Sequence, residues 1–235
     1  MRLKQLLVLS VTLLFTSGCT KPLPNGALYF PLDEDRSWLY RIKRITPDGE
    51  SEIRQHLRTV YVGKTAGVTE ATKQTTSGKK YQYEIREGAV ARILPTEHAS
   101  LRSTSSTTAQ IMLPKNALKG TRWGSTLTTT VLESSQPPWE KKFRIAVTMP
   151  ISYEVLSTQS KVTTPAGFFE NCLHIKGKGS IIHHAGGYIG QTTVEIETEE
   201  WFAPNIGVVK IRREERTSSE ALPRGTLFLE LIDWK

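Results

Sequence analysis

The sequence predicts a mainly β protein built from an antiparallel sheet, with few short helices. Beyond residue 28 the chain is rich in Thr, Val, Ile and aromatic residues, which favour strands. Gly, Asn, Asp and Pro interrupt it at intervals of roughly 8–12 residues, a spacing typical of an all-β sheet, sandwich or barrel. Helical periodicity is poor everywhere except over residues 114–118, which are too few for an independent helix.

The first expected hairpin shows the pattern. Over residues 37–43, Trp38, Tyr40 and Ile42 alternate with the residues between them, and a period of two fits a half-buried strand. The Pro-Asp-Gly sequence at 47–49 predicts a turn, because Pro presets φ, Asp bonds its own backbone and Gly accepts a positive φ. Further strands, each bounded by turn residues, are expected over 50–62, 68–74, 79–86, 89–94, 125–133, 142–149, 151–157, 191–202, 208–216 and 226–234.

Composition and length restrict the class of protein. With 235 residues, 38% of them hydrophobic and 23% charged, the chain is neither collagen-like, nor wholly disordered, nor a multi-span membrane protein. Two cysteines exclude a disulfide-dense scaffold and a four-cysteine zinc site. No linker divides the chain after residue 28, so we expect residues 29–235 to form a single β-rich domain.

The amino terminus predicts export. Residues 1–18 contain the three parts of a signal peptide: positive charge at Arg2 and Lys4, an apolar run from Leu6 to Phe15, and small residues at the end. That run of 10 residues is half of the ~20 that a helix needs to cross a bilayer. A transmembrane anchor is therefore the less favoured interpretation.

Thr16-Ser17-Gly18-Cys19 resembles the lipobox of bacterial lipoproteins, although the family usually has an aliphatic residue in place of Thr16. The resemblance implies cleavage before Cys19, acylation of Cys19 and, because Thr20 rather than Asp follows, location in the Gram-negative outer membrane facing the periplasm. Residues 19–28 would then be a lipidated tether, since prolines punctuate them. A plain secretory signal cut near Gly18 is the alternative.

The remaining cysteine and the charge bear on partners. With Cys19 lipidated, we expect Cys172 to be a small buried hydrophobe, with intermolecular pairing as the alternative. The net charge of +8 becomes +6 when residues 1–18 are removed, and the basic residues are dispersed. Nucleic acid is not an expected partner of an exported protein. The membrane, anionic lipid headgroups, peptidoglycan carboxylates or an envelope protein fit the compartment better.

Two segments resemble a family. Residues 164–173, TPAGFFENCL, and 200–210, EWFAPNIGVVK, are similar to the TPAG-x-F…C and W-[YF]-A-P-x-x-G-V-V-K pattern of β-rich bacterial envelope proteins, most of them without an assigned activity. Asn205 stands where the pattern has Gly. Some of these proteins resemble the curled half-barrels of lipoprotein-localisation factors and periplasmic lipid binders. The resemblance implies a single curled antiparallel sheet, either half-barrel or sandwich-like.

We interpret this motif as structural. A loop over 204–207 would place Trp201 opposite Lys210 and Glu199 opposite Arg212. The cation–π pair and the ion pair expected there would each contribute ~0.2–1 kcal/mol at an exposed site. The residues central to the motif are Gly167, Cys172, Trp201, Pro204 and Gly207.

Two motifs have the residue types of a chemical site but not the context. His183-His184 would point to opposite faces if the segment is a strand, so the pair could not readily share a metal ion. The Ser-x-x-Lys pattern at 77–80 is that of penicillin-binding enzymes, but it lies in a Gly turn and the partner motifs are missing. We therefore predict no catalytic residue, no metal site and no cofactor.

Three glutamates would share one face of a strand. Glu195, Glu197 and Glu199 are two residues apart, so they could bind a cation or take part in acid–base chemistry. A charge ladder with the next strand is the favoured interpretation, because basic residues follow closely in the chain. These are Lys210, Arg212 and Arg216.

The favoured function is a non-enzymatic interaction or scaffold role for a lipid-anchored envelope protein. The alternative is a carrier or sensor that binds an apolar, lipid-like ligand inside the curled sheet. A metal hydrolase around His183 and Glu195 is the least favoured. The apolar face that the carrier needs could come from Trp38, Tyr40, Phe143, Phe202 and Phe228.

The lipobox resemblance predicts that Cys19 is lipidated. Cells labelled with a palmitate analogue should incorporate the label into the wild-type chain and not into Cys19→Ala, because the variant lacks the cysteine whose acylation the resemblance implies. Equal labelling of both chains would contradict the anchor.

Overall fold

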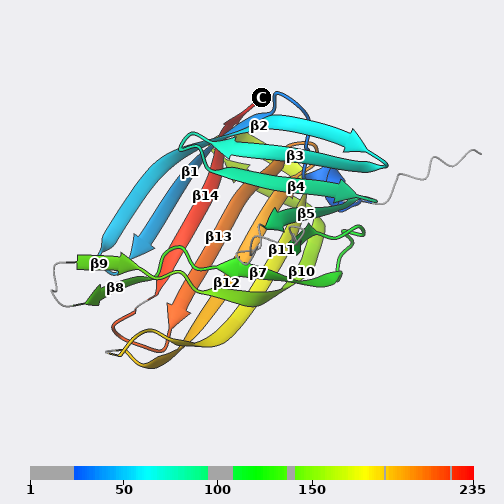
Figure 1. Ribbon diagram of the computed structural model, residues 1–235. Helices are drawn as coiled ribbons and strands as arrows, with labels where there is room; N and C mark the ends of the chain where they lie inside the picture. Colours follow the sequence, from blue (N-terminus) through cyan, green and yellow to red (C-terminus); the bar gives the residue numbers. More distant parts are fainter. Residues whose placement is uncertain (1–23, 95–107, 137–140, 188, 223) are drawn as a thin grey trace, which may run out of the picture.

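The predicted mainly β fold is confirmed. The computed structural model describes residues 24–94, 108–136, 141–187, 189–222 and 224–235. In these residues the chain forms one antiparallel sheet of twelve strands, a separate two-stranded sheet and one short 3-10 helix, η1 (Figure 1). No helix in the described ranges is long and apolar enough to cross a membrane. The elements are η1 (Gly26–Tyr29), β1 (Ser37–Thr46), β2 (Gly49–Thr65), β3 (Val68–Thr75), β4 (Lys80–Arg86), β5 (Ala89–Leu94), β6 (Thr108–Leu113), β7 (Arg122–Thr128), β8 (Glu133–Gln136), β9 (Lys141–Arg144), β10 (Thr148–Thr164), β11 (Gly167–His184), β12 (Gln191–Ala203), β13 (Gly207–Thr217) and β14 (Gly225–Trp234).

The large sheet curls into a nearly closed barrel, which goes beyond the expected half-barrel. Its strand order is β6-β5-β4-β3-β2-β1-β14-β13-β12-β11-β10-β7. The two end strands meet through side chains: Ser125 Oγ of β7 donates to the Ile111 carbonyl of β6 at 2.9 Å, and Gln110 Nε2 of β6 donates to the Thr126 carbonyl of β7. Hydrogen bonds from side chains, rather than a ladder of backbone hydrogen bonds, therefore join β6 to β7.

The expected strands 125–133 and 142–149 are each interrupted. β7 pairs with β10, and the small sheet β8–β9 continues the hairpin beyond a break at 129–132. The break exists because the buried carboxylate of Glu215 on β13 accepts the backbone N–H groups of Thr130 (2.9 Å) and Val131 (2.8 Å). Strand β11, which is 18 residues long, lies between the expected strands 151–157 and 191–202.

The hairpin expected over 194–202 and 208–216 is confirmed. β12 and β13 pair with Trp201 opposite Lys210 and Glu199 opposite Arg212. Asn205 in the connecting turn has φ 59°, in the left-handed region that Asn tolerates better than most residues.

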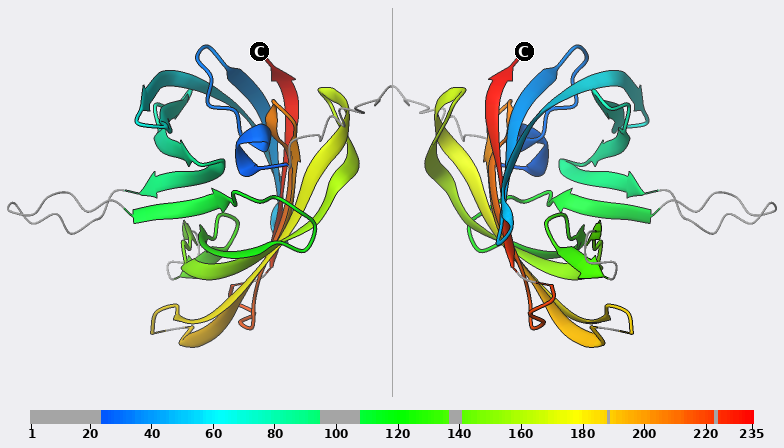
Figure 2. Two further views of the ribbon diagram at one scale, coloured as in Figure 1. Left: turned by 90° about the vertical axis from the view of Figure 1, so that its right-hand side faces the viewer. Right: turned by 90° about the vertical axis from the view of Figure 1, so that its left-hand side faces the viewer.

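The barrel interior is filled partly by the chain's own N-terminal segment. Figure 2 shows η1 between the arc of β2–β5 and the wall of long strands. Tyr29, Phe30 and Leu32 are buried there against residues from most of the barrel strands. A second cluster forms around Trp38 and Tyr40 of β1. The described part of the expected tether, residues 24–28, thus belongs to the folded body, with the Gly26 N–H donating to the Pro114 carbonyl at 3.1 Å.

Two glycines let the long strands pack closely. A Cβ on Gly177 of β11 would lie 2.6 Å from the ring of Tyr153, and a Cβ on Gly179 would lie 2.5 Å from the carbonyl oxygen of Pro150. The second contact is with backbone, which cannot rotate away. Packing of β11 against β10 therefore requires Gly179.

We predict that Gly179→Ala lowers the free energy of unfolding by about 1–3 kcal/mol through overpacking. Gly124 of β7 has open space around its Cβ position, so Gly124→Ala should be neutral or stabilising by ~0.4–1 kcal/mol. Urea denaturation of both variants measures the difference, and equal midpoints would contradict the packing argument.

Candidate functional site

Strand β3 separates two environments. Lys73 points into the barrel and is buried, so its neighbours Thr72 and Gln74 point to the opposite face. The strand register aligns Gln74 with Arg58 of β2 on one side and with Lys80 of β4 on the other. Neighbouring strands lie ~4.8 Å apart, so the backbones of Arg58 and Lys80 lie roughly 10 Å apart, on either side of Gln74.

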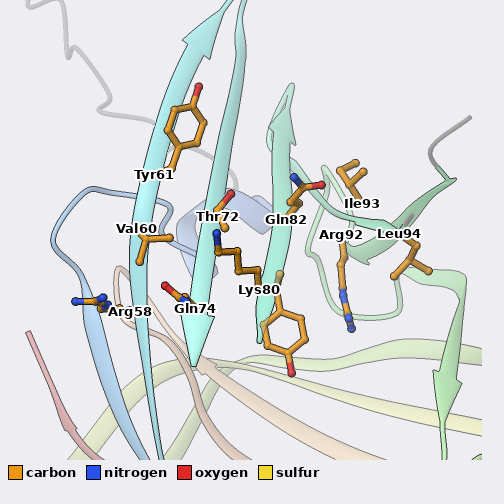
Figure 3. Close-up of a pocket in the computed structure, with 11 residues that line it drawn as sticks. Arg58, Val60, Tyr61, Thr72, Gln74, Lys80, Gln82, Arg92, Ile93 and Leu94 are labelled. Atoms are coloured by element: carbon orange, nitrogen blue, oxygen red, sulfur yellow. The ribbon is translucent and has the colours of Figure 1, made fainter. Parts of the chain in front are cut away.

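A groove with a volume of about 560 Å³ lies over this row (Figure 3). Its size is in the range typical of small-molecule sites, ~300–1,000 Å³. We call it the β2–β5 groove, and its lining residues are Arg58, Val60, Tyr61, Thr72, Gln74, Lys80, Tyr81, Gln82, Arg92, Ile93 and Leu94.

The charge of the β2–β5 groove is of one sign. Arg58, Lys80 and Arg92 line it, and none of the carboxylates that the structure describes does. In the described ranges no carboxylate forms an ion pair with any of these three cations. Arg92 instead lies over the ring of Tyr81, 4.7 Å from its centroid. Among the residues that the structure describes, the positive charge of the groove is therefore uncompensated.

A second, smaller hollow, over β1 and β14, provides a contrast. It contains Glu52 and Glu230 beside its two cations. Arg41 is 2.6 Å from Glu230, and Lys43 is 2.6 Å from Glu50. Its cations are already neutralised, so it lacks the electrostatic feature of the β2–β5 groove.

Apolar side chains lie at both edges of the β2–β5 groove, on β2 and on β5. Val60 is 40% exposed and Tyr61 is 56% exposed, and both belong to the small set of large apolar side chains that reach solvent. Ile93 and Leu94 of β5 also line the groove. The groove thus combines cations with solvent-exposed apolar surface.

The inner face of β3 carries an aromatic cage. The Lys73 ammonium lies 4.0 Å from the ring centroid of Trp38, 4.3 Å from that of Phe30 and 5.8 Å from that of Tyr83. It donates to the Pro31 carbonyl at 3.1 Å. Burial lowers the pKa of Lys73 to about 7, with a smaller opposing effect from Asp33 and a reinforcing one from Arg36.

The cage holds the N-terminal segment against the barrel, and hydrogen bonds to the 204–206 turn hold the same segment at a second place. The Asn205 N–H donates to the Leu28 carbonyl at 2.8 Å, and Arg36 donates to the Asn205 carbonyl at 2.9 Å. The indole of Trp38 donates to the Ile206 carbonyl at 2.7 Å. These contacts hold the inner wall behind the β2–β5 groove.

The motif residues predicted as structural lie near these contacts or in the packed wall. Gly167 begins β11 with φ 137°, and Gly207 begins β13 with φ 102°, directly after the turn that contains Pro204. Cys172 is a free, fully buried thiol, and burial raises its pKa to about 11. The ring of Trp201 on β12 stacks on a side chain of the preceding strand, β11.

The expected cation–π pair between Trp201 and Lys210 is corrected. Trp201 stacks on His174 of β11, with 4.4 Å between ring centroids and 12° between planes. The Lys210 ammonium is 3.3 Å from Glu230 of β14. Trp201 and Lys210 therefore each contact a residue on a strand outside the hairpin, although the two residues lie opposite each other as predicted.

Two of the three glutamates, Glu197 and Glu199, belong to a wider charge ladder, but the ion pair expected between Glu199 and Arg212 is corrected, because Arg212 contacts Glu214. Glu197 lies 4.0 Å from Arg216 of β13, 3.7 Å from Lys178 of β11, and also contacts Lys176. Glu199 is 3.2 Å from His174, also on β11. The partners come mainly from the neighbouring strand that precedes β12 rather than from the one that follows it.

The remaining chemical candidates lie apart. His183 and His184 are consecutive residues at the end of β11, and Ser77 lies in the β3–β4 turn. Within the described ranges, no group of three or more His, Cys, Asp or Glu side chains is placed to hold a metal ion.

The residues proposed for an apolar-ligand face do not share a face. Trp38 and Phe202 are 2% and 1% exposed, and Tyr40 is also buried, in two packed clusters of the interior. Phe228 lies on the outer face of β14, in the hollow beside Arg41. Phe143 is in β9 but its side chain lies outside the described residues, as does all of Cys19.

The β2–β5 groove was not predicted from the sequence. Its cations come from β2, β4 and β5, and each looks like an ordinary strand residue on a solvated face. The one available signal was that no acidic residue accompanies Lys79-Lys80 in the turn and strand start around them. The lack of an acidic residue there points to a groove only once the register of β2, β3, β4 and β5 is known.

The fold is similar to that of a solved structure from Parabacteroides distasonis provisionally described as a lipoprotein, with a TM-score of 0.51 and 13% sequence identity over 88% of this chain and 98% of that one. A provisionally described exported protein with a YmcC-like fold from Bacteroides fragilis matches with a TM-score of 0.47 and 18% identity over 88% of this chain and 99% of that one. No protein-family model and no curated protein sequence matches the chain. At these identities the similarity concerns the fold alone.

We predict that Lys73→Met changes stability in a pH-dependent way. The pKa of Lys73 is about 7 in the folded state and ~10.4 in an unfolded chain. Between these values the unfolded state binds the proton that the native state has lost, so wild-type stability rises with pH in this window. The variant lacks this contribution.

We compare the free energy of unfolding of Lys73→Met with that of wild type at each pH. Relative to wild type, the variant should be most stable below pH 7 and should lose this relative stability towards pH 10. Urea titrations at pH 6, 8 and 9.5 measure it, with the exposed Lys64→Met as the control. A difference that does not change with pH would contradict the burial of an ionisable Lys73.

Proposed function

We propose that this chain is an exported protein of the bacterial envelope, anchored by lipid at Cys19 to the outer membrane, with a non-enzymatic binding role in the periplasm. The signal-like residues 1–18 and the lipobox-like sequence before Cys19 support export and anchoring. The similarity in fold to a protein provisionally described as a lipoprotein supports the same assignment.

The β2–β5 groove is the observation that carries the binding role. Three cations without a carboxylate partner in the described ranges line a hollow of about 560 Å³. Elsewhere on the barrel many cations are matched, as in the pairs Arg122–Glu154 at 2.8 Å and Lys161–Glu170 at 2.7 Å. Unmatched charge in a hollow raises the local concentration of anions, which is a feature of binding rather than of stability.

A carrier that holds an apolar ligand inside the barrel has less support. The interior positions that would line its cavity, Trp38, Tyr40 and Phe202, contact other side chains of the packed clusters. Tyr29, Phe30 and Leu32 of the N-terminal segment occupy the space between the walls.

The anchor limits which partners the groove can reach. Residues 20–23 separate Cys19 from Pro24, the first described residue, and the five Cα-to-Cα steps between them span at most about 17 Å when fully extended. A barrel held so close to the membrane would meet membrane lipids and other envelope components. Its partner is therefore proposed to be an anionic component of the envelope.

Site-specific photo-crosslinking in cells tests this function. Val60 in the groove and Ile182 on β11, which is 70% exposed, are each replaced by p-benzoylphenylalanine in the full chain. We expect a discrete adduct with an envelope component at Val60, and none at Ile182, because only the first position adjoins the cations.

The adduct should be lost when Arg58→Gln and Lys80→Gln are added to the Val60 variant. Equal, nonspecific crosslinking at both positions, or none at Val60, would contradict a binding role for the groove.

A further inference from the structure

We infer that the β2–β5 groove binds the phosphate group of an anionic lipid, with the apolar part of the lipid against the apolar side chains at its two edges, Val60 on β2 and Ile93 and Leu94 on β5. This inference rests on the proposed function and names its ligand class. It follows from the charge, the spacing and the apolar edges of the groove.

The charge of the groove calls for an oxyanion. Two of its three cations are arginines, whose planar guanidinium groups present paired donors that match phosphate oxygens. Since no acidic residue of the described ranges belongs to the lining, a cationic or neutral ligand leaves this charge uncompensated. A phosphate ester carries one to two negative charges and compensates most of it.

The spacing suits a group of the size of a phosphate. Arg58 and Lys80 flank Gln74 in one row across β2, β3 and β4, roughly 10 Å apart at the backbone. Both side chains are exposed and long enough to converge on a group above Gln74. Thr72 and Gln82 face each other in the next row, and their hydroxyl and amide groups can donate to the remaining oxygens.

The apolar edges distinguish a lipid from a free anion. Val60 and Tyr61, at the β2 edge of the groove, are 40% and 56% exposed, and Ile93 and Leu94 line the opposite edge, on β5. Inorganic phosphate would leave these side chains in contact with water. The glycerol and first methylene groups of a lipid would cover them, and each buried methylene contributes ~0.8 kcal/mol.

Binding of short-chain lipids to the full chain, purified from membranes in a non-ionic detergent, tests the inference by calorimetry. The probes are dihexanoyl phosphatidic acid, zwitterionic dihexanoyl phosphatidylcholine and inorganic phosphate. We expect saturable binding of the phosphatidic acid, with a Kd at least tenfold lower than for either other probe. Because surface charge is screened by salt, the affinity should fall as ionic strength rises.

Two double variants of equal charge change accompany the wild type. Arg58→Gln with Lys80→Gln removes two exposed cations of the groove, and should weaken binding of phosphatidic acid at least tenfold. Lys161→Gln with Lys178→Gln removes two exposed cations on β10 and β11, outside the groove, and should leave it unchanged. Thermal unfolding should show both variants folded, since exposed positions tolerate such changes.

Three results would overturn the inference: no saturable binding of phosphatidic acid, equal affinity for phosphatidic acid and phosphatidylcholine, or an equal effect of the two double variants. Inorganic phosphate binding as tightly as phosphatidic acid would overturn the lipid assignment in favour of a free anion. A groove-specific crosslink to a protein or glycan, without lipid binding, would also overturn it while leaving the proposed binding role in place.

Discussion

The burial of one lysine organises the N-terminal half of this barrel. Lys73 sits 3% exposed inside the sheet, where an isolated charge would be strongly unfavourable. The Pro31 carbonyl and the rings of Phe30 and Trp38 surround it. Because these groups come from the N-terminal segment and β1, satisfying the lysine brings that segment into the barrel. The filled interior of this region follows from that requirement.

This inner arrangement explains why the candidate site lies outside. Side chains alternate along β3, so a strand that commits Lys73 to the interior must present Thr72 and Gln74 to the other face. The same alternation applies to β2 and β4, and the register then brings Arg58 and Lys80 together over Gln74. The inner face of these strands therefore packs in the core, while their outer face carries the groove's positive charge, which no described carboxylate pairs with.

The pairing of side chains shows where local patterns lose their predictive value. The register of the β12–β13 hairpin was predictable from the pair Trp201–Lys210 onwards, because a short turn sets the register of the strands that it joins. Next to the turn the register shifts between Trp201 and Phe202, so that Gly207 pairs with Ala203 instead of belonging to the loop. The partner of Trp201 was not predictable, because each strand of a sheet has two neighbours and the hairpin reveals one. His174 and Glu230 lie on the strands that flank the hairpin on either side, and nothing in the turn specifies which strands these are.

The sequence by itself determined the strand-and-turn character of the chain, most strand positions and the β12–β13 register, because period-two alternation and turn residues act over a few neighbouring positions. It also contained the export-like amino terminus. Only the tertiary structure decided that the sheet nearly closes, that the N-terminal segment fills it, and that Arg58, Lys80 and Arg92 meet in one groove. These features depend on contacts between residues far apart in the chain, and their free energies arise from burial and charge pairing across strands whose order no local pattern encodes.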